Sequence, residues 1–104
     1  MAKVKAIFFL PLRDNDGRTL QAEIDAAEFE LYTAFAGLTF DGVKKGMYRM
    51  KDLSKAVDEC AAYFVLLDEE RLDEVKEVLR RFKAKTTQEA IYFEVQYNVV
   101  IDFI

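Results

Sequence analysis

Both faces of the two most apolar strand-like segments carry apolar side chains. In residues 4–12, apolar side chains occupy both parities of an extended chain, namely Val4, Ala6, Phe8 and Leu10 on one side and Ile7 and Phe9 on the other. Residues 60–67 place an apolar or aromatic side chain at every position. A strand with one face in water alternates apolar and polar residues, so the sequence predicts that both faces of these two strands are covered.

The first predicted strand covers residues 3–12, and a turn follows it. Residues 13–17 read Arg-Asp-Asn-Asp-Gly, which combines side chains that bond to the backbone with a glycine that tolerates positive φ. The following residues 18–24 permit two structures. Their apolar and polar residues alternate, as in the second strand of a hairpin. This local pattern leaves helix and strand open.

A longer repeat favours a helix over residues 20–36. Apolar side chains recur there at steps of four, three, four and four, at Leu20, Ile24, Ala27, Leu31 and Phe35. We expect Thr19 to cap this helix and Gly37 to end it. A shorter helix capped by Asp25, with Glu28 three residues later, is the alternative.

The middle of the chain predicts two strands joined by a polar connection at residues 51–55. The first covers residues 38–40, is interrupted at Asp41-Gly42 and at Gly46, and resumes over residues 47–50. The second covers residues 57–67. These two strands are expected to be neighbours in one sheet.

A second helix is predicted over residues 69–84. Its apolar stripe consists of Leu72, Val75, Val78, Leu79 and Phe82. Asp68 is the expected cap, acidic residues fill the first turns, and basic residues follow at the end. This charge distribution suits the helix dipole.

Residues 88–104 read as extended chain after a short loop at residues 85–87. Seven apolar or aromatic residues from Ile91 to Phe103 share one parity. A continuous strand over residues 89–104 would be roughly 53 Å long at ~3.3 Å per residue, whereas a compact domain of this size is about 33 Å across. We therefore expect a bend near Tyr97-Asn98, or a tail that reaches another subunit.

The predicted order is β-α-β-β-α-β, which defines an α+β, ferredoxin-like sandwich in one domain over residues 1–104. Its antiparallel sheet has two helices on one face, and its first and third strands are central. Those are the two strands that are apolar on both faces. The second face therefore requires another cover, and a homodimer through this face and the C-terminal strand is the simplest one.

Composition excludes several kinds of chemistry. The 104 residues contain no histidine and a single cysteine, so histidine triads, histidine metal sites and intramolecular disulfides are absent. We expect neither a metal site nor a cofactor. The lone Cys60 fits a reducing, cytoplasmic compartment. No segment is long and apolar enough to span a membrane, and the net charge of −4 disfavours binding to nucleic acid.

Two groups of residues are candidate ligand sites. The turn at residues 13–17 gathers Arg13, Asp14 and Asp16, which suits a cation or a polar ligand, although a plain turn explains the same residues. Tyr48, Tyr63, Tyr92 and Tyr97 could line a pocket on the uncovered face of the sheet. Packing in a core or an interface is the competing explanation for these tyrosines.

Two charged groups complete the candidates. Asp58 and Glu59 could form an acid–base cluster with Arg49 or Lys51, although a solvated strand entrance explains them as well. A basic stretch runs from Lys44 to Lys55. Sheets of this type can bind RNA through exposed aromatic residues, but the expected glycine and aromatic motif of such strands is missing.

Several short motifs together resemble a group of small bacterial hypothetical proteins of unknown function. The matching segments are residues 9–17, 35–39 and 46–48, then Asp58-Glu59 with residues 63–65, and finally residues 88–91. Such proteins often carry tryptophan where this chain has Tyr48, and the apolar tail after Tyr97 also departs from them. The resemblance implies a ferredoxin-like fold and an origin among mobile elements or accessory genes. It implies no activity and no catalytic residue.

The leading hypothesis from the sequence is a cytoplasmic homodimer that serves as a binding or interaction module without catalysis. The alternative is a small-molecule-binding protein or enzyme of the dimeric α/β-barrel type, with a pocket between sheet and helices. Such a pocket would require a convergent polar group with a strongly shifted pKa. An RNA-binding module is the third hypothesis.

Overall fold

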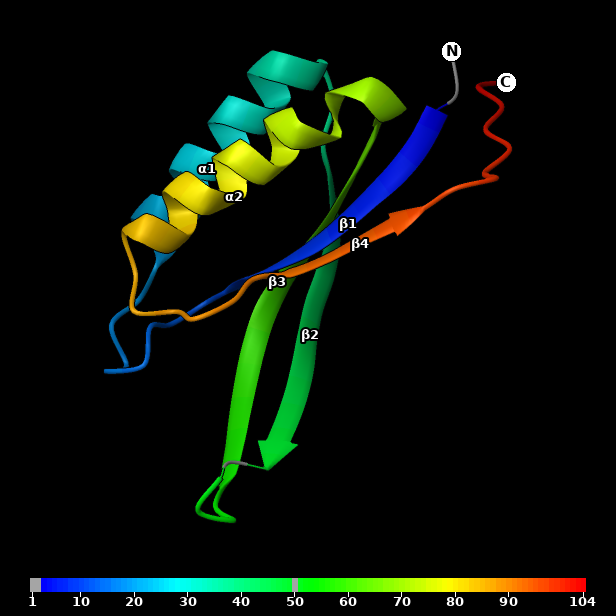
Figure 1. Cartoon of the computed structure of the whole chain (residues 1–104). Helices are drawn as coiled ribbons and strands as arrows, with labels where there is room; N and C mark the ends of the chain where they lie inside the picture. The colour runs from blue at the N-terminus through cyan, green and yellow to red at the C-terminus, as the bar shows by residue number, and fades with distance from the viewer. Residues whose placement is uncertain (1–2, 50) are drawn as a thin grey trace.

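The fold is a single four-stranded antiparallel sheet with both helices on one face (Figure 1). The computed structural model describes residues 3–49 and 51–104. Its elements are β1 (Lys3–Pro11), α1 (Gln21–Phe35), β2 (Thr39–Arg49), β3 (Lys55–Asp68), a 3₁₀ turn (Glu69–Arg71), α2 (Leu72–Ala84) and β4 (Tyr92–Gln96). The strand order is β2-β3-β1-β4. The predicted ferredoxin-like α+β fold, with the first and third strands in the centre, is confirmed.

The core lies between the sheet and the helices. The side chains on one face of β1 are fully buried against the helices, namely Val4, Ala6, Phe8 and Leu10. Phe8 lies opposite Tyr63 of β3 and Phe93 of β4. The helices contribute the remaining core side chains, which include Ile24, Leu31, Val75, Leu79 and Phe82. The apolar stripes of both helices are therefore the ones that the sequence predicts.

Residues 18–24 do not form the second strand of a hairpin. Only Thr19 bridges back to Arg13, and α1 begins at Gln21. The capping position is occupied by Leu20, without a side-chain bond, and not by Thr19 as expected. Thr19 lies one residue earlier, in this bridge, and its hydroxyl accepts the N–H of Gln21 at 3.4 Å. The burial of Leu20 and Ile24 on one helix face outweighs the local alternation.

Helix α1 ends one residue earlier than expected. Ala36, not Gly37, adopts the left-handed conformation, with φ of 56°, and its N–H donates to the carbonyl of Tyr32. A Cβ disfavours this conformation. Ala36→Gly is therefore expected to stabilise the fold by about 1 kcal/mol and to raise Tm by about 4 °C in thermal unfolding.

Ala34→Gly is the matched control for this change. Ala34 lies inside α1 and is exposed, so glycine there costs helix propensity and is expected to lower stability by about 1 kcal/mol. A decrease in Tm for both variants would contradict a strained Ala36.

Strand β2 is continuous apart from one bulge. The register against β3 shifts between Phe40 and Val43, where Gly42 has φ of 84°. The sequence suggested an interruption at Gly46, but the strand continues through this residue. The ring of Tyr48 instead lies where a Cβ on residue 46 would be, so glycine is required for this contact. The expected strand included Met50, which lies outside the described residues.

Beyond the bulge, β2 and β3 extend past the helices as a hairpin arm, which we define as residues 44–58 without residue 50 (Figure 1). The arm gives the molecule its longest dimension of 46 Å. Met47, Leu53 and Val57 are among its exposed apolar side chains. The arm therefore has no core of its own.

Helix α2 begins later than expected because its predicted cap is engaged elsewhere. Strand β3 continues to Asp68, whose carboxylate pairs with the ammonium group of Lys3 at 2.9 Å. The 3₁₀ turn follows, and α2 begins at Leu72 without a side-chain cap.

The long extended segment at the end of the chain forms only a short strand. Ile91, Phe93 and Val95 pack against the core on the predicted parity. The chain then leaves the sheet at residues 97–98, where Asn98 has φ of 57°, which confirms the expected bend. In the remaining tail, residues 99–104, Val100, Phe103 and Ile104 are exposed.

Candidate functional site

The face of the sheet opposite the helices has an apolar centre. Ile7 of β1 lies between Phe64 of β3 and Glu94 of β4, and Phe9 lies between Ala62 and Tyr92. We call this surface the uncovered face. Its apolar positions are Ile7, Phe9, Cys60, Ala62, Phe64, Leu66 and Tyr92, most of which are half-buried.

Charged side chains of both signs surround this centre. The ammonium group of Lys5 lies 4.1 Å from the centroid of the Phe64 ring. On β4, the hydroxyl of Tyr92 donates to Glu94 at 2.8 Å, and its ring stacks on Phe9 with centroids 4.5 Å apart. The hydrogen bond from Tyr92, a second one from Gln96 and the charge of Lys5 lower the pKa of Glu94.

Asp14 of the candidate loop is a buried connector between two loops. Its side chain is almost wholly buried, and it accepts hydrogen bonds from the hydroxyl and N–H of Thr87 at 2.6 and 3.0 Å. Gln88, Asn15 and Arg18 donate to the same carboxylate. The bond from the Thr87 hydroxyl, with the others, holds the pKa of Asp14 well below its usual range, although burial acts in the opposite direction.

The rest of the loop satisfies its own polar groups. Arg13 donates to the carbonyl of Gly17 at 3.0 Å, and Asp16 accepts the N–H of Arg18 at 2.9 Å. No group of three or more acidic, histidine or cysteine residues in residues 3–49 and 51–104 is arranged to hold a metal ion. Arg13 and Asp16 thus bond within the β1–α1 loop, whereas Asp14 joins this loop to the α2–β4 loop.

A cleft of about 610 Å³ separates this loop from the base of the hairpin arm, where Asp58 and Glu59 line it. The candidate acid–base cluster, for which a solvated strand entrance was the competing explanation, does not form among the described residues. Successive strand residues point to opposite faces, so the carboxylates of Asp58 and Glu59 diverge. Arg49 lies opposite Lys55, far along the strand from both. Lys44 and Lys45 diverge in the same way, which divides the basic stretch between two faces.

The four candidate tyrosines do not share one face. Tyr48 and Tyr92 lie on the uncovered face, and Tyr97 lies beyond β4 at the bend. Tyr63 points to the helices, where it is buried between Phe8 and Phe40. The sequence could not assign Tyr63 to a face, because both parities of its strand are apolar.

Tyr63 borders a hollow of about 380 Å³ between α1 and the β2–β3 pair. Burial raises the pKa of its hydroxyl, and the carboxylate of Glu28 in the same hollow acts in the same direction. The space between the sheet and the two helices is otherwise filled by core side chains. The hollow beside Tyr63 lies between the sheet and a helix, where the α/β-barrel alternative places its pocket, and Tyr63 is a polar group there with a raised pKa.

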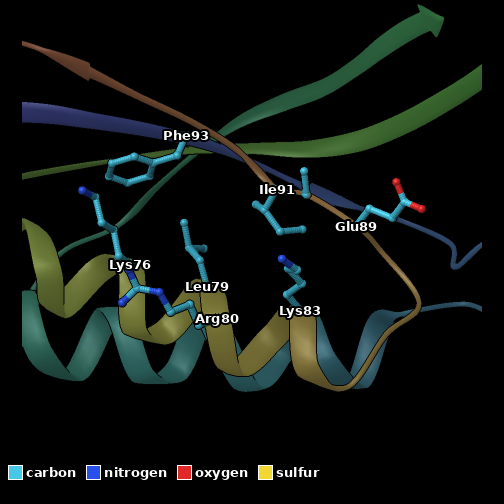
Figure 2. Close-up of a pocket in the computed structure, with 8 residues that line it drawn as sticks. Lys76, Leu79, Arg80, Lys83, Glu89, Ile91 and Phe93 are labelled. Atoms are coloured by element: carbon cyan, nitrogen blue, oxygen red, sulfur yellow. The ribbon is translucent and has the colours of Figure 1, made fainter.

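A groove of about 290 Å³ runs between α2 and β4 (Figure 2). Leu79 of α2 faces Ile91 across this groove, with Phe93 beside them. The basic side chains of Lys76, Arg80 and Lys83 line its helix side. Their spacing of four and three residues places them on one helix face. The helix dipole explained Arg80 and Lys83 in the sequence, but it did not include Lys76, which lies on the same helix face.

Comparison with known proteins shows what kind of fold this is. The sequence matches no family model and no curated protein. The fold recurs in solved structures, among them the following two. A phage SAM lyase in complex with S-methyl-5'-thioadenosine superposes with a TM-score of 0.66 at 15% identity, over 92% of this chain and 81% of that chain. CutA1 from Oryza sativa superposes with a TM-score of 0.69 at 10% identity, over 98% and 84%. At such identities the likeness shows the fold alone.

The described helices include none that is both long and apolar enough to cross a membrane.

Proposed function

We propose that this protein is a homodimeric interaction module of a reducing, cytoplasmic compartment, and that two copies associate through their uncovered faces. The observation that carries the proposal is the apolar centre of the uncovered face, which no described element covers. Burial of such a centre is the main favourable contribution to association between proteins. No catalytic group is needed for this role.

The uncovered face has the composition of a protein interface. Aromatic and aliphatic side chains lie at its centre, and charged groups lie around them. Interfaces characteristically combine a dry apolar centre with a polar rim. Phe9, Phe64 and Tyr92 supply the large aromatic contacts that contribute most to association.

A second copy is the partner favoured by the charges. Lys5 and Lys44 of the uncovered face are basic, whereas Asp58 and Glu94 are acidic. A surface that carries both signs can be complementary to itself across a two-fold axis. A strongly acidic partner would place its carboxylates against Asp58 and Glu94, and a strongly basic partner would place its cations against Lys5 and Lys44.

The hairpin arm and the tail offer further apolar surface to a second copy. An isolated two-stranded hairpin is marginal in water, yet the arm projects with Tyr48 exposed on the side of the uncovered face and Leu53 exposed in its turn. Phe103 of the tail borders a hollow of about 280 Å³ together with Phe64 and Leu66, close to the uncovered face. We infer that residues 99–104 take part in the same interface.

The solution mass tests this proposal. Size exclusion with light scattering, between about 5 and 100 µM protein, is expected to give twice the chain mass of 12.0 kDa. A constant mass of 12.0 kDa over this range would show that the uncovered face does not bind a second copy. A stable higher multiple would contradict a two-fold pair.

A further inference from the structure

The two free edges of the sheet differ in how well they could accept another strand. The edge at β2 is interrupted by the bulge at residues 41–42 and carries Lys44 and Lys45. Bulges and lysines are the usual features that prevent an edge from pairing with a further chain. The edge at β4 pairs with β1 alone among the described strands, has no bulge, and carries Glu94 as its single charge. The β4 edge is therefore the open one.

The groove beside α2 lies next to this open edge (Figure 2). Lys76 extends along the groove, with its ammonium group 5.7 Å from the centroid of the Phe93 ring. Arg80 is paired with Glu77 of its own helix, and Lys83 has no ion pair within the described ranges. Figure 2 shows the carboxylate of Glu89 directed away from Lys83. The groove thus combines an apolar floor with a positively charged wall.

We propose that the β4 edge and this groove bind an extended acidic segment of a partner protein as a fifth strand of the sheet. The free N–H and C=O groups of β4 would pair with the backbone of the segment. Alternate side chains of the added strand would then point toward α2, where Lys76, Arg80 and Lys83 favour carboxylates. This site is separate from the uncovered face and does not rest on self-association.

Charge complementarity favours such a segment over a second copy at this site. The side chains of β4 that face the helices are Phe93 and Val95, and both are apolar. A β4 strand from another copy would bring the same apolar side chains beside α2. In the tail, Asp102 is the only charged residue. Neither segment of this chain would bring a carboxylate to both Lys76 and Lys83, which have no ion pair within the described ranges.

A titration of the full-length, ¹⁵N-labelled protein tests the proposal. The probe is a capped octapeptide that alternates glutamate and valine, and its controls are the lysine–valine peptide and an N-methylated glutamate–valine peptide. We expect amide shifts in β4 and α2 with the first probe. Its binding should be at least roughly tenfold tighter than that of either control, because one control reverses the charge and the other removes backbone donors.

Charge reversal of the groove provides the protein-side test. The combined variant Lys76→Glu, Arg80→Glu and Lys83→Glu is expected to bind the glutamate–valine peptide roughly tenfold or more weakly. The control variant Lys45→Glu changes the opposite edge of the sheet, on the side away from the uncovered face, and should bind normally. The single variant Lys83→Glu provides the readout if the triple variant is unfolded.

Equal binding of all three peptides, shifts confined to β2, or no shift up to about 1 mM peptide would overturn the proposal. Shifts in β4 that depend on protein concentration alone would assign the edge to a second copy instead.

Discussion

Replacing Ile7 with lysine is expected to convert the protein from a dimer to a monomer of 12.0 kDa. Ile7 lies at the centre of the uncovered face, between Phe64 and Glu94 on the neighbouring strands. In the monomer, lysine at this position is solvated and lies beside the carboxylate of Glu94. In the dimer, two-fold symmetry would bury two such lysines in an apolar centre. We expect the dissociation constant to rise by at least roughly 100-fold, as measured by light scattering across a dilution series.

Phe29→Lys is the matched control for Ile7→Lys. Phe29 lies on α1, away from the uncovered face, and is 71% exposed. The same change from apolar to basic there should leave the mass unchanged. Both variants should keep the native far-UV circular dichroism and a cooperative unfolding transition, which excludes a folding defect as the cause of dissociation. Phe29→Lys should keep the native Tm, whereas monomeric Ile7→Lys should unfold at a lower Tm, because association stabilises the folded state. A dimer that survives in Ile7→Lys would place the interface elsewhere.

Replacing Asp14 with alanine is expected to lower Tm by roughly 10 °C. The carboxylate of Asp14 accepts the hydroxyl and N–H of Thr87 and also pairs with Arg18. Its removal leaves the donors of the α2–β4 loop without partners beside the core. Asp16→Asn is the control, since Asp16 is exposed and, among the described residues, accepts only the N–H of Arg18. Equal losses of Tm in the two variants would contradict the connecting role of Asp14.

The same carboxylate predicts a loss of stability in acid. Hydrogen bonds from Thr87 hold the pKa of Asp14 below its ordinary value of 3.8. A carboxyl group with a lowered pKa stabilises the folded state fully above its unfolded pKa, and this contribution is lost as the pH falls below it. The free energy of unfolding of the native chain should therefore decrease below about pH 4. Asp14→Asn should lose less over the same range, because it lacks the titrating group.

The periodicity of the chain predicted the fold well where burial decides the structure. The steps between Leu20 and Phe35 outweighed the alternation of residues 18–24, because a helix face packs against the core whereas a hairpin there would not. The two-faced pattern of β1 and β3 likewise identified the central strands. In both cases the signal is spread over a whole element, so neighbouring residues report the same environment.

Positions set by a single long-range contact could not be predicted in the same way. The main partner of Asp14 is Thr87, which is 73 residues away in the chain. Asp68 resembled a helix cap, but its carboxylate pairs with Lys3 across the sheet. The turn at residues 13–17 and the cap at residue 68 were both interpreted from local sequence. Their carboxylates are instead bound to residues that only the fold brings near.

The hairpin arm implies that local order and association are coupled. Its backbone hydrogen bonds are protected by one neighbouring strand and by no packed layer, so its amides should exchange with solvent through local opening rather than through global unfolding. The bulge at residues 41–42 separates this arm from the part of β2 beside the core. If a partner covers the arm, the arm loses conformational entropy on binding. The association should then depend more steeply on temperature than the unfolding of the core does. The same four strands would then contain two cooperative units, one that defines the fold and one that responds to its partner.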